Sequence, residues 1–100
     1  MIDRLTEKVF AFLDNPEPVI DWLKTLGCKD VVQSEPGSWA LTGLTGIRCG
    51  LVQADPITVA TQFGFLLAGP YWPQVYRGLH KAVDKRWTER RKKGWDWKVP

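Results

Sequence analysis

Four side chains in this sequence have the types needed for nucleophilic or metal chemistry: Cys28, Cys49, the only histidine, His80, and Asp84. His80 and Asp84 stand four residues apart, a spacing that brings two side chains together on one helix. With a cysteine nearby they would imitate a Cys-His-Asp arrangement. A two-residue match of this kind arises easily by chance. The simpler interpretation is a surface histidine beside a surface aspartate, with the cysteines packed as small apolar residues. We therefore expect no catalytic site.

Metal and phosphate sites lack the residue spacings that they need. The sequence contains no C-x-x-C, H-x-x-x-H or H-E-x-x-H pattern, so zinc ligands would have to come from scattered places. The glycine-containing segment 42–46 matches neither phosphate-binding glycine pattern, and a hairpin turn explains it more simply. We expect no metal and no cofactor.

The cysteine count and the first residues indicate a compartment. Two cysteines are too few for a disulfide framework, and the N-terminus lacks the basic-then-apolar pattern of a signal peptide. Residues 56–76 carry no charge, which raises the question of a membrane span, but Pro70 and Pro73 interrupt them and the continuous apolar part is only 63–72. The sequence therefore predicts a cytoplasmic protein with free thiols and without a membrane span.

Composition and charge describe one small domain with a cationic end. The chain has 100 residues, 44% hydrophobic and 25% charged, which is ordinary for a single globular domain over 1–100. The net charge of +3 conceals an asymmetry, because residues 1–70 hold five basic and eight acidic side chains, whereas residues 71–100 hold nine basic and three acidic. The +6 end would attract phosphate or an acidic protein surface.

Local start and stop signals predict an α+β fold. Asn15-Pro16 and Asp55-Pro56 are cap-plus-proline helix starts, Gly27 ends a helix, and Pro36-Gly37 fits the centre of a type II turn. The predicted elements are helices over 3–14 and 16–26, which form an αα-hairpin, strands over 30–33, 39–44 and 47–53 in an antiparallel meander, and helices over 56–68 and 73–93. The expected core side chains are Leu5, Val9, Phe12, Trp22, Leu23, Leu26, Phe63, Leu67, Leu79 and Val83.

The predicted helix over 56–68 is apolar nearly all the way round. Such a helix is either buried centrally or covered by a partner. We expect Phe63, Phe65 and Leu66 to contact a second copy of the chain or to line a partner groove. The alternative is that Trp22 and Trp39 close over the helix within one chain.

Arginine and aromatic residues gather at the C-terminal end. Basic residues near a helix C-terminus are favoured by the helix dipole alone, but arginine beside tryptophan is also typical of binding hot spots. The candidate partner-binding residues are Trp72, Arg86, Trp87, Arg90, Arg91, Trp95 and Trp97. Because Arg90 falls on the apolar side of the helix, the helix end is expected to project past the body of the domain. The tail 93–100 alternates with period two, so it is either an edge strand or a free binding element.

The function that this pattern favours is a non-enzymatic protein-binding module: an inhibitor, adaptor or assembly factor that acts on a larger protein or complex through the aromatic and arginine-rich end. Small proteins of phages and mobile elements fit the profile by analogy of size. The alternative is a nucleic-acid-binding protein that uses the basic C-terminal helix, although the acidic body would repel a long phosphate track. An enzyme based on cysteine or histidine is the third class, and it lacks its catalytic set.

Overall fold

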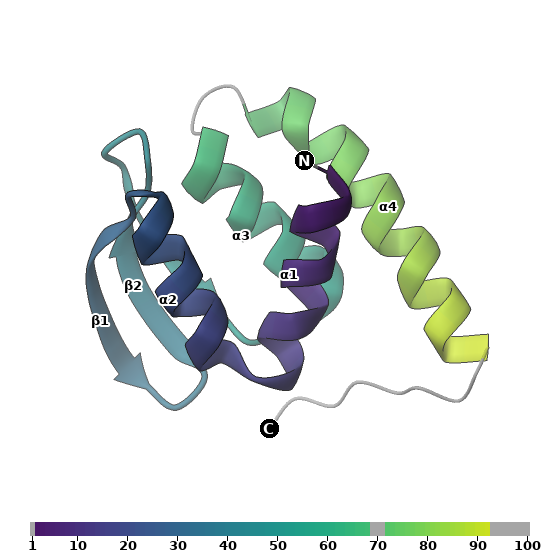
Figure 1. The fold of residues 1–100 in the computed structure, drawn as a ribbon, viewed down its shortest axis with the longest axis horizontal. Helices are drawn as coiled ribbons and strands as arrows, with labels where there is room; N and C mark the ends of the chain where they lie inside the picture. Colours follow the sequence, from purple (N-terminus) through teal and green to yellow (C-terminus); the bar gives the residue numbers. More distant parts are fainter. Residues whose placement is uncertain (1, 69–71, 93–100) are drawn as a thin grey trace.

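Two helices, a three-stranded antiparallel sheet and two further helices follow one another along the chain, as the sequence predicts. The computed structural model describes residues 2–68 and 72–92 (Figure 1). The elements are α1 (Ile2–Asp14), α2 (Pro16–Leu26), β1 (Lys29–Glu35), β2 (Ser38–Thr42), β3 (Arg48–Val52), α3 (Pro56–Ala68) and α4 (Trp72–Lys92). The predicted tail over 93–100, with its possible edge strand, lies outside the described residues.

The corner between α1 and α2 is made by proline, and α2 ends at glycine. Pro16 and Pro18 lie in the first turn of α2, where a missing backbone N–H costs nothing. Asn15 has the extended conformation of a cap residue, but its side chain makes no capping hydrogen bond, so the proline alone supplies the start signal. Gly27 adopts a φ of 122°, and the amide of Cys28 then donates to the carbonyl of Leu23.

The sheet has the order β1-β2-β3, with Trp39 of β2 opposite Gln33 on one side and Leu51 on the other. Gly37 has a φ of 81°, as a type II turn between β1 and β2 requires. β1 is exposed along nearly its whole length, whereas β2 alternates into the core. The sheet is therefore covered on one face by helices, and β1 forms its exposed edge (Figure 1).

The loop between β2 and β3 is fastened to the end of α3. The amide of Leu44 donates to the carbonyl of Leu66 at 2.8 Å. A Cβ placed on Gly43 would stand 2.5 Å from that same carbonyl oxygen, so only glycine permits this close approach. The hairpin thus satisfies a carbonyl that the last turn of α3 leaves without a partner.

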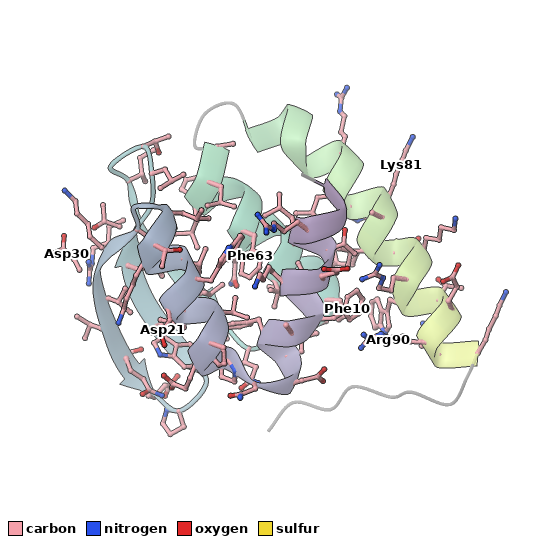
Figure 2. All side chains as sticks on the ribbon, in the orientation of Figure 1. Phe10, Asp21, Asp30, Phe63, Lys81 and Arg90 are labelled. Atoms are coloured by element: carbon pink, nitrogen blue, oxygen red, sulfur yellow. The ribbon has the colours of Figure 1, made fainter. Side chains whose placement is uncertain are left out.

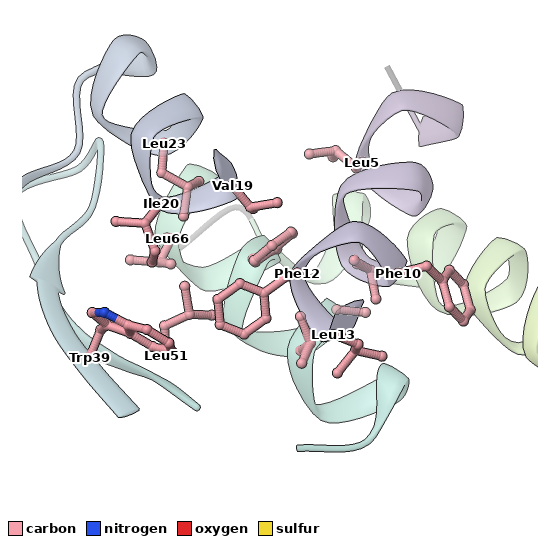
Figure 3. Close-up of a cluster of buried hydrophobic side chains, with 14 of the residues drawn as sticks. Leu5, Phe10, Phe12, Leu13, Val19, Ile20, Leu23, Trp39, Leu51 and Leu66 are labelled. Atoms are coloured by element: carbon pink, nitrogen blue, oxygen red, sulfur yellow. The ribbon is translucent and has the colours of Figure 1, made fainter. Parts of the chain in front are cut away.

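The core lies between the sheet and α1, α2 and α3, and continues between α1, α3 and α4. The ring of Phe12 is at its centre and lies edge-to-face with Trp39, at 5.5 Å between ring centroids (Figure 3). It also lies edge-to-face with Phe63, at 6.0 Å. Most of the predicted core is confirmed, but Trp22 and Leu67 are only partly buried, and Leu26 is 42% exposed. Leu26 lies at the end of α2, beyond the part of the helix that the other elements cover.

Two of the three side chains that the sequence predicts at a dimer contact or partner groove lie inside the chain. Phe63 and Leu66 are fully buried, whereas Phe65 is half-buried. Helix α3 packs against α1, α4 and β3 together, so much of its apolar surface is covered within the chain. The alternative prediction is that Trp22 and Trp39 close over this helix. Trp39 is 4% exposed and contacts Phe12, which in turn contacts Phe63 of α3, whereas Trp22 is only partly buried.

Candidate interaction surface

Helix α4 buries one stripe of its surface and exposes cations on the other. Leu79 and Val83 are fully buried against α1 and α3. The opposite side carries five exposed basic side chains, which we call the cationic face: Arg77, Lys81, Lys85, Arg91 and Lys92. Figure 2 shows Lys81 directed away from the body of the molecule. From residue 77 to residue 92 the helix holds seven basic and two acidic residues, a net charge of +5.

The end of α4 does not project freely, contrary to the expectation from Arg90. The guanidinium carbon of Arg90 lies 4.4 Å from the centroid of the Phe10 ring on α1. Arg90 therefore extends the buried stripe of α4 as a half-buried residue, because the flat guanidinium group can stack on an aromatic ring while its edges stay hydrated.

The predicted partner-binding residues separate into two groups in the structure. Arg86, Trp87 and Arg90 are half-buried, with Trp87 packed against the core and Arg90 stacked on Phe10. Arg91 is exposed, with its guanidinium carbon 5.5 Å from the centroid of the Trp87 ring. Trp72 begins α4, but its side chain is outside the described part of the structure. The predicted sites Trp95 and Trp97 also lie outside it.

Sequence reasoning missed the residues of α1 that receive α4. Phe10 and Thr6 are 1% and 2% exposed, on a second buried side of α1. Their spacing of four residues was the available signal, but a threonine in this stripe hid its apolar character. Thr6 also lines a polar groove of about 310 Å³ between α1 and α4, together with Ala82, Lys85, Arg86 and Glu89.

The structure does not bring the cysteines to His80 and Asp84. Cys28 precedes β1 and Cys49 lies in β3, on the opposite side of the molecule from α4 (Figure 1). Burial raises the pKa of both thiols, and the neighbouring Cys28 raises that of Cys49 further. A raised pKa keeps a thiol protonated and therefore a poor nucleophile.

Within residues 2–68 and 72–92, the histidine, cysteine, aspartate and glutamate side chains do not come together in groups of three or more that would suit a metal ion. No helix in the described ranges 2–68 and 72–92 combines the length and the apolar character needed to cross a membrane.

Comparison of the chain with protein-family models, curated proteins and solved structures finds no match.

Proposed function

We propose that this chain is a non-enzymatic protein-binding module, and that the cationic face of α4 binds an acidic surface on a larger protein. The observation that carries the proposal is the row of five exposed cations along α4, behind which Leu79 and Val83 anchor the helix in the core. Complementary charge of this kind steers association and selects the partner.

Two features favour a protein partner over a nucleic acid. Trp87 is partly buried in the core and lies beneath Arg91, so it is not an open platform on which a base can stack. Exposed Asp84 and Glu89 interrupt the row of cations, and residues 1–70 carry a net charge of −3. Both would repel a continuous phosphate backbone, whereas a protein surface can match a mixed pattern of charges.

A module of this size would act as an inhibitor, an adaptor or an assembly factor, each of which works by covering or bridging a larger protein. The size analogy with small phage and mobile-element proteins belongs to the same proposal. The alternative function, binding of nucleic acid through α4, would use the same cations. Nuclease treatment distinguishes it from binding of a protein.

The test compares two double variants in a pull-down with and without nuclease. Lys81→Glu/Lys85→Glu reverses two charges on the cationic face. Lys24→Glu/Lys29→Glu makes the same change on exposed residues of α2 and β1, on the other side of the molecule. We expect a protein partner that survives nuclease and the control substitutions, but is lost with the α4 variant. Recovery of nucleic acid alone would favour the alternative, and equal binding by both variants would contradict any role for α4.

A further inference from the structure

A second candidate site lies at the end of the molecule where α1 begins. It is a cavity of about 610 Å³, within the usual range of about 300–1,000 Å³ for small-molecule sites. Four segments meet there: the start of α1, the end of α2, the loop between β2 and β3, and the end of α3 (Figure 1). The lining residues are Arg4, Leu5, Trp22, Leu26, Leu44, Leu67 and Ala68.

The walls of this cavity are apolar and firmly placed. Leu5 is 4% exposed and belongs to the core. Leu44 is held by the hydrogen bond from its amide to Leu66, and its Cδ2 lies 3.0 Å from the position that a Cβ on Gly27 would take. The cavity is therefore formed by the fold itself rather than by a loose surface segment.

Exposed leucines surround the mouth of the cavity. Leu26 is 42% exposed and Leu44 is 44% exposed, and they are two of the five large hydrophobic residues exposed among the described ones. Apolar side chains concentrated at a cavity mouth are typical of a ligand site, because isolated exposed leucines need no explanation but grouped ones do.

The charge of the cavity is one-sided. Among the described residues that line the cavity, Arg4 is the only charged one, and no carboxylate among the described side chains forms an ion pair with it. Lys8, one turn further along α1, places its Nζ 5.0 Å from the centroid of the Trp22 ring. An apolar cavity with cations on one side is complementary to a molecule with one apolar end and one anionic end.

From this complementarity we propose that the cavity binds a single-chain carboxylate, such as a medium-chain fatty acid. The alkyl chain lies against Trp22, Leu26 and Leu44, and the carboxylate meets the guanidinium of Arg4 in the paired geometry that arginine offers. This binding site is separate from the cationic face of α4, and it does not depend on the proposed protein-binding function.

The test measures binding of dodecanoate by calorimetry, below its micelle concentration, to the whole chain. Dodecanol, which lacks the charge, and hexanoate, which lacks most of the apolar surface, are the ligand controls. We expect saturable one-site binding of dodecanoate, with dodecanol about fivefold weaker because it lacks the charge pair with Arg4, and with hexanoate at least about tenfold weaker. Absence of saturable binding, or equal affinity for dodecanol, would overturn the proposal.

Two pairs of variants locate the site. Arg4→Gln should weaken dodecanoate binding about fivefold, the scale of an exposed charge pair, whereas Arg77→Gln on α4 should leave it unchanged. Leu26→Glu places a negative charge at the cavity mouth and should abolish binding, whereas Val32→Glu adds the same charge to exposed β1 without effect. All four positions are exposed, and melting curves would verify that each variant folds. If both members of each pair bind alike, the ligand lies elsewhere.

A further ligand tests whether the cavity binds a protein segment instead of a small molecule. It is a short helical peptide that is apolar along one side and acidic at one end. If this peptide binds at Leu26 and Leu44 while dodecanoate does not, the cavity is a docking site for a protein segment and the carboxylate proposal is wrong.

Discussion

The guanidinium of Arg90 lies over the ring of Phe10, 4.4 Å from its centroid, and holds the end of α4 against α1 (Figure 2). This contact decides which cations of the C-terminal helix are available to a partner. Arg90 faces inward, so the neighbouring Arg91 and Lys92 are the exposed cations of the last turn. Arg90, a residue of the predicted basic binding cluster, thus also packs against the interior of the domain.

Arg90→Ala should lower the free energy of unfolding by about 1–2 kcal/mol, because it removes a partly buried cation–aromatic contact and uncovers Phe10. Urea denaturation measures this change. Arg91→Ala is the matched control, since Arg91 is exposed and its guanidinium is 5.5 Å from the Trp87 ring. Its effect should stay within about 0.5 kcal/mol. An equal loss in the two variants would show that the Arg90 contact has no special weight.

Three leucines test the position of the core. Leu23 and Leu79 are fully buried, so truncation of either to alanine should cost about 2–5 kcal/mol of stability. Leu26, on the same helix as Leu23, is 42% exposed, and Leu26→Ala should cost less than about 1 kcal/mol. Thermal or urea unfolding separates the two outcomes. A large effect at Leu26 would mean that something covers the end of α2 in solution.

Gly43 and Gly50 form a second matched pair. A methyl group on Gly43 would stand 2.5 Å from the carbonyl oxygen of Leu66, so Gly43→Ala must displace the β2–β3 loop from α3. We expect a loss of about 1–3 kcal/mol, the usual cost of overpacking. At Gly50 the nearest atom to a new Cβ is 3.9 Å away, and Gly50→Ala should be neutral or slightly stabilising. If the urea midpoint of Gly43→Ala equals that of the wild type, the β2–β3 loop does not pack against the carbonyl of Leu66 in solution.

The order of elements could be predicted because the signals that set it are local. Asp55-Pro56 places the start of α3, Gly27 the end of α2, and Pro36-Gly37 the first turn of the meander. Each acts through the dihedral angles or hydrogen bonds of a few neighbouring residues, so a single sequence contains the information.

The candidate site was less predictable because it depends on contacts between distant segments. No local signal relates Arg90 to Phe10, or Leu44 to the carbonyl of Leu66. The composition of α3 indicated that it must be covered, but not that α1, α4 and β3 are the elements that pack against it. An apolar pattern shows how much surface a helix must bury, whereas the identity of what buries it is a property of the whole fold.

Asp55 should make the stability of α3 depend on pH. Its carboxylate accepts hydrogen bonds from the amide of Thr58 at 3.0 Å and from the hydroxyl of Thr58 at 2.7 Å. Burial alone would raise the pKa of this carboxyl, but these hydrogen bonds outweigh burial and hold the pKa below its usual value. Because the carboxylate binds its proton less readily in the folded chain than in the unfolded one, its contribution is complete above the unfolded pKa of about 3.9.

That contribution is then lost as the pH falls through the lower pKa of the folded chain. Asp55→Ala should be less stable than the wild type by about 1 kcal/mol at neutral pH, the usual value of a helix cap. The difference should shrink as the pH is lowered below about 4, where the wild-type carboxylate becomes protonated. Asp55→Ser is the control, because serine keeps a capping oxygen that does not titrate, so part of the stability should return without its pH dependence. Urea midpoints of the three proteins between neutral and acidic pH measure both effects. A wild-type advantage over Asp55→Ala that stays constant down to the lowest pH would show that the charge of Asp55 does not stabilise the start of α3.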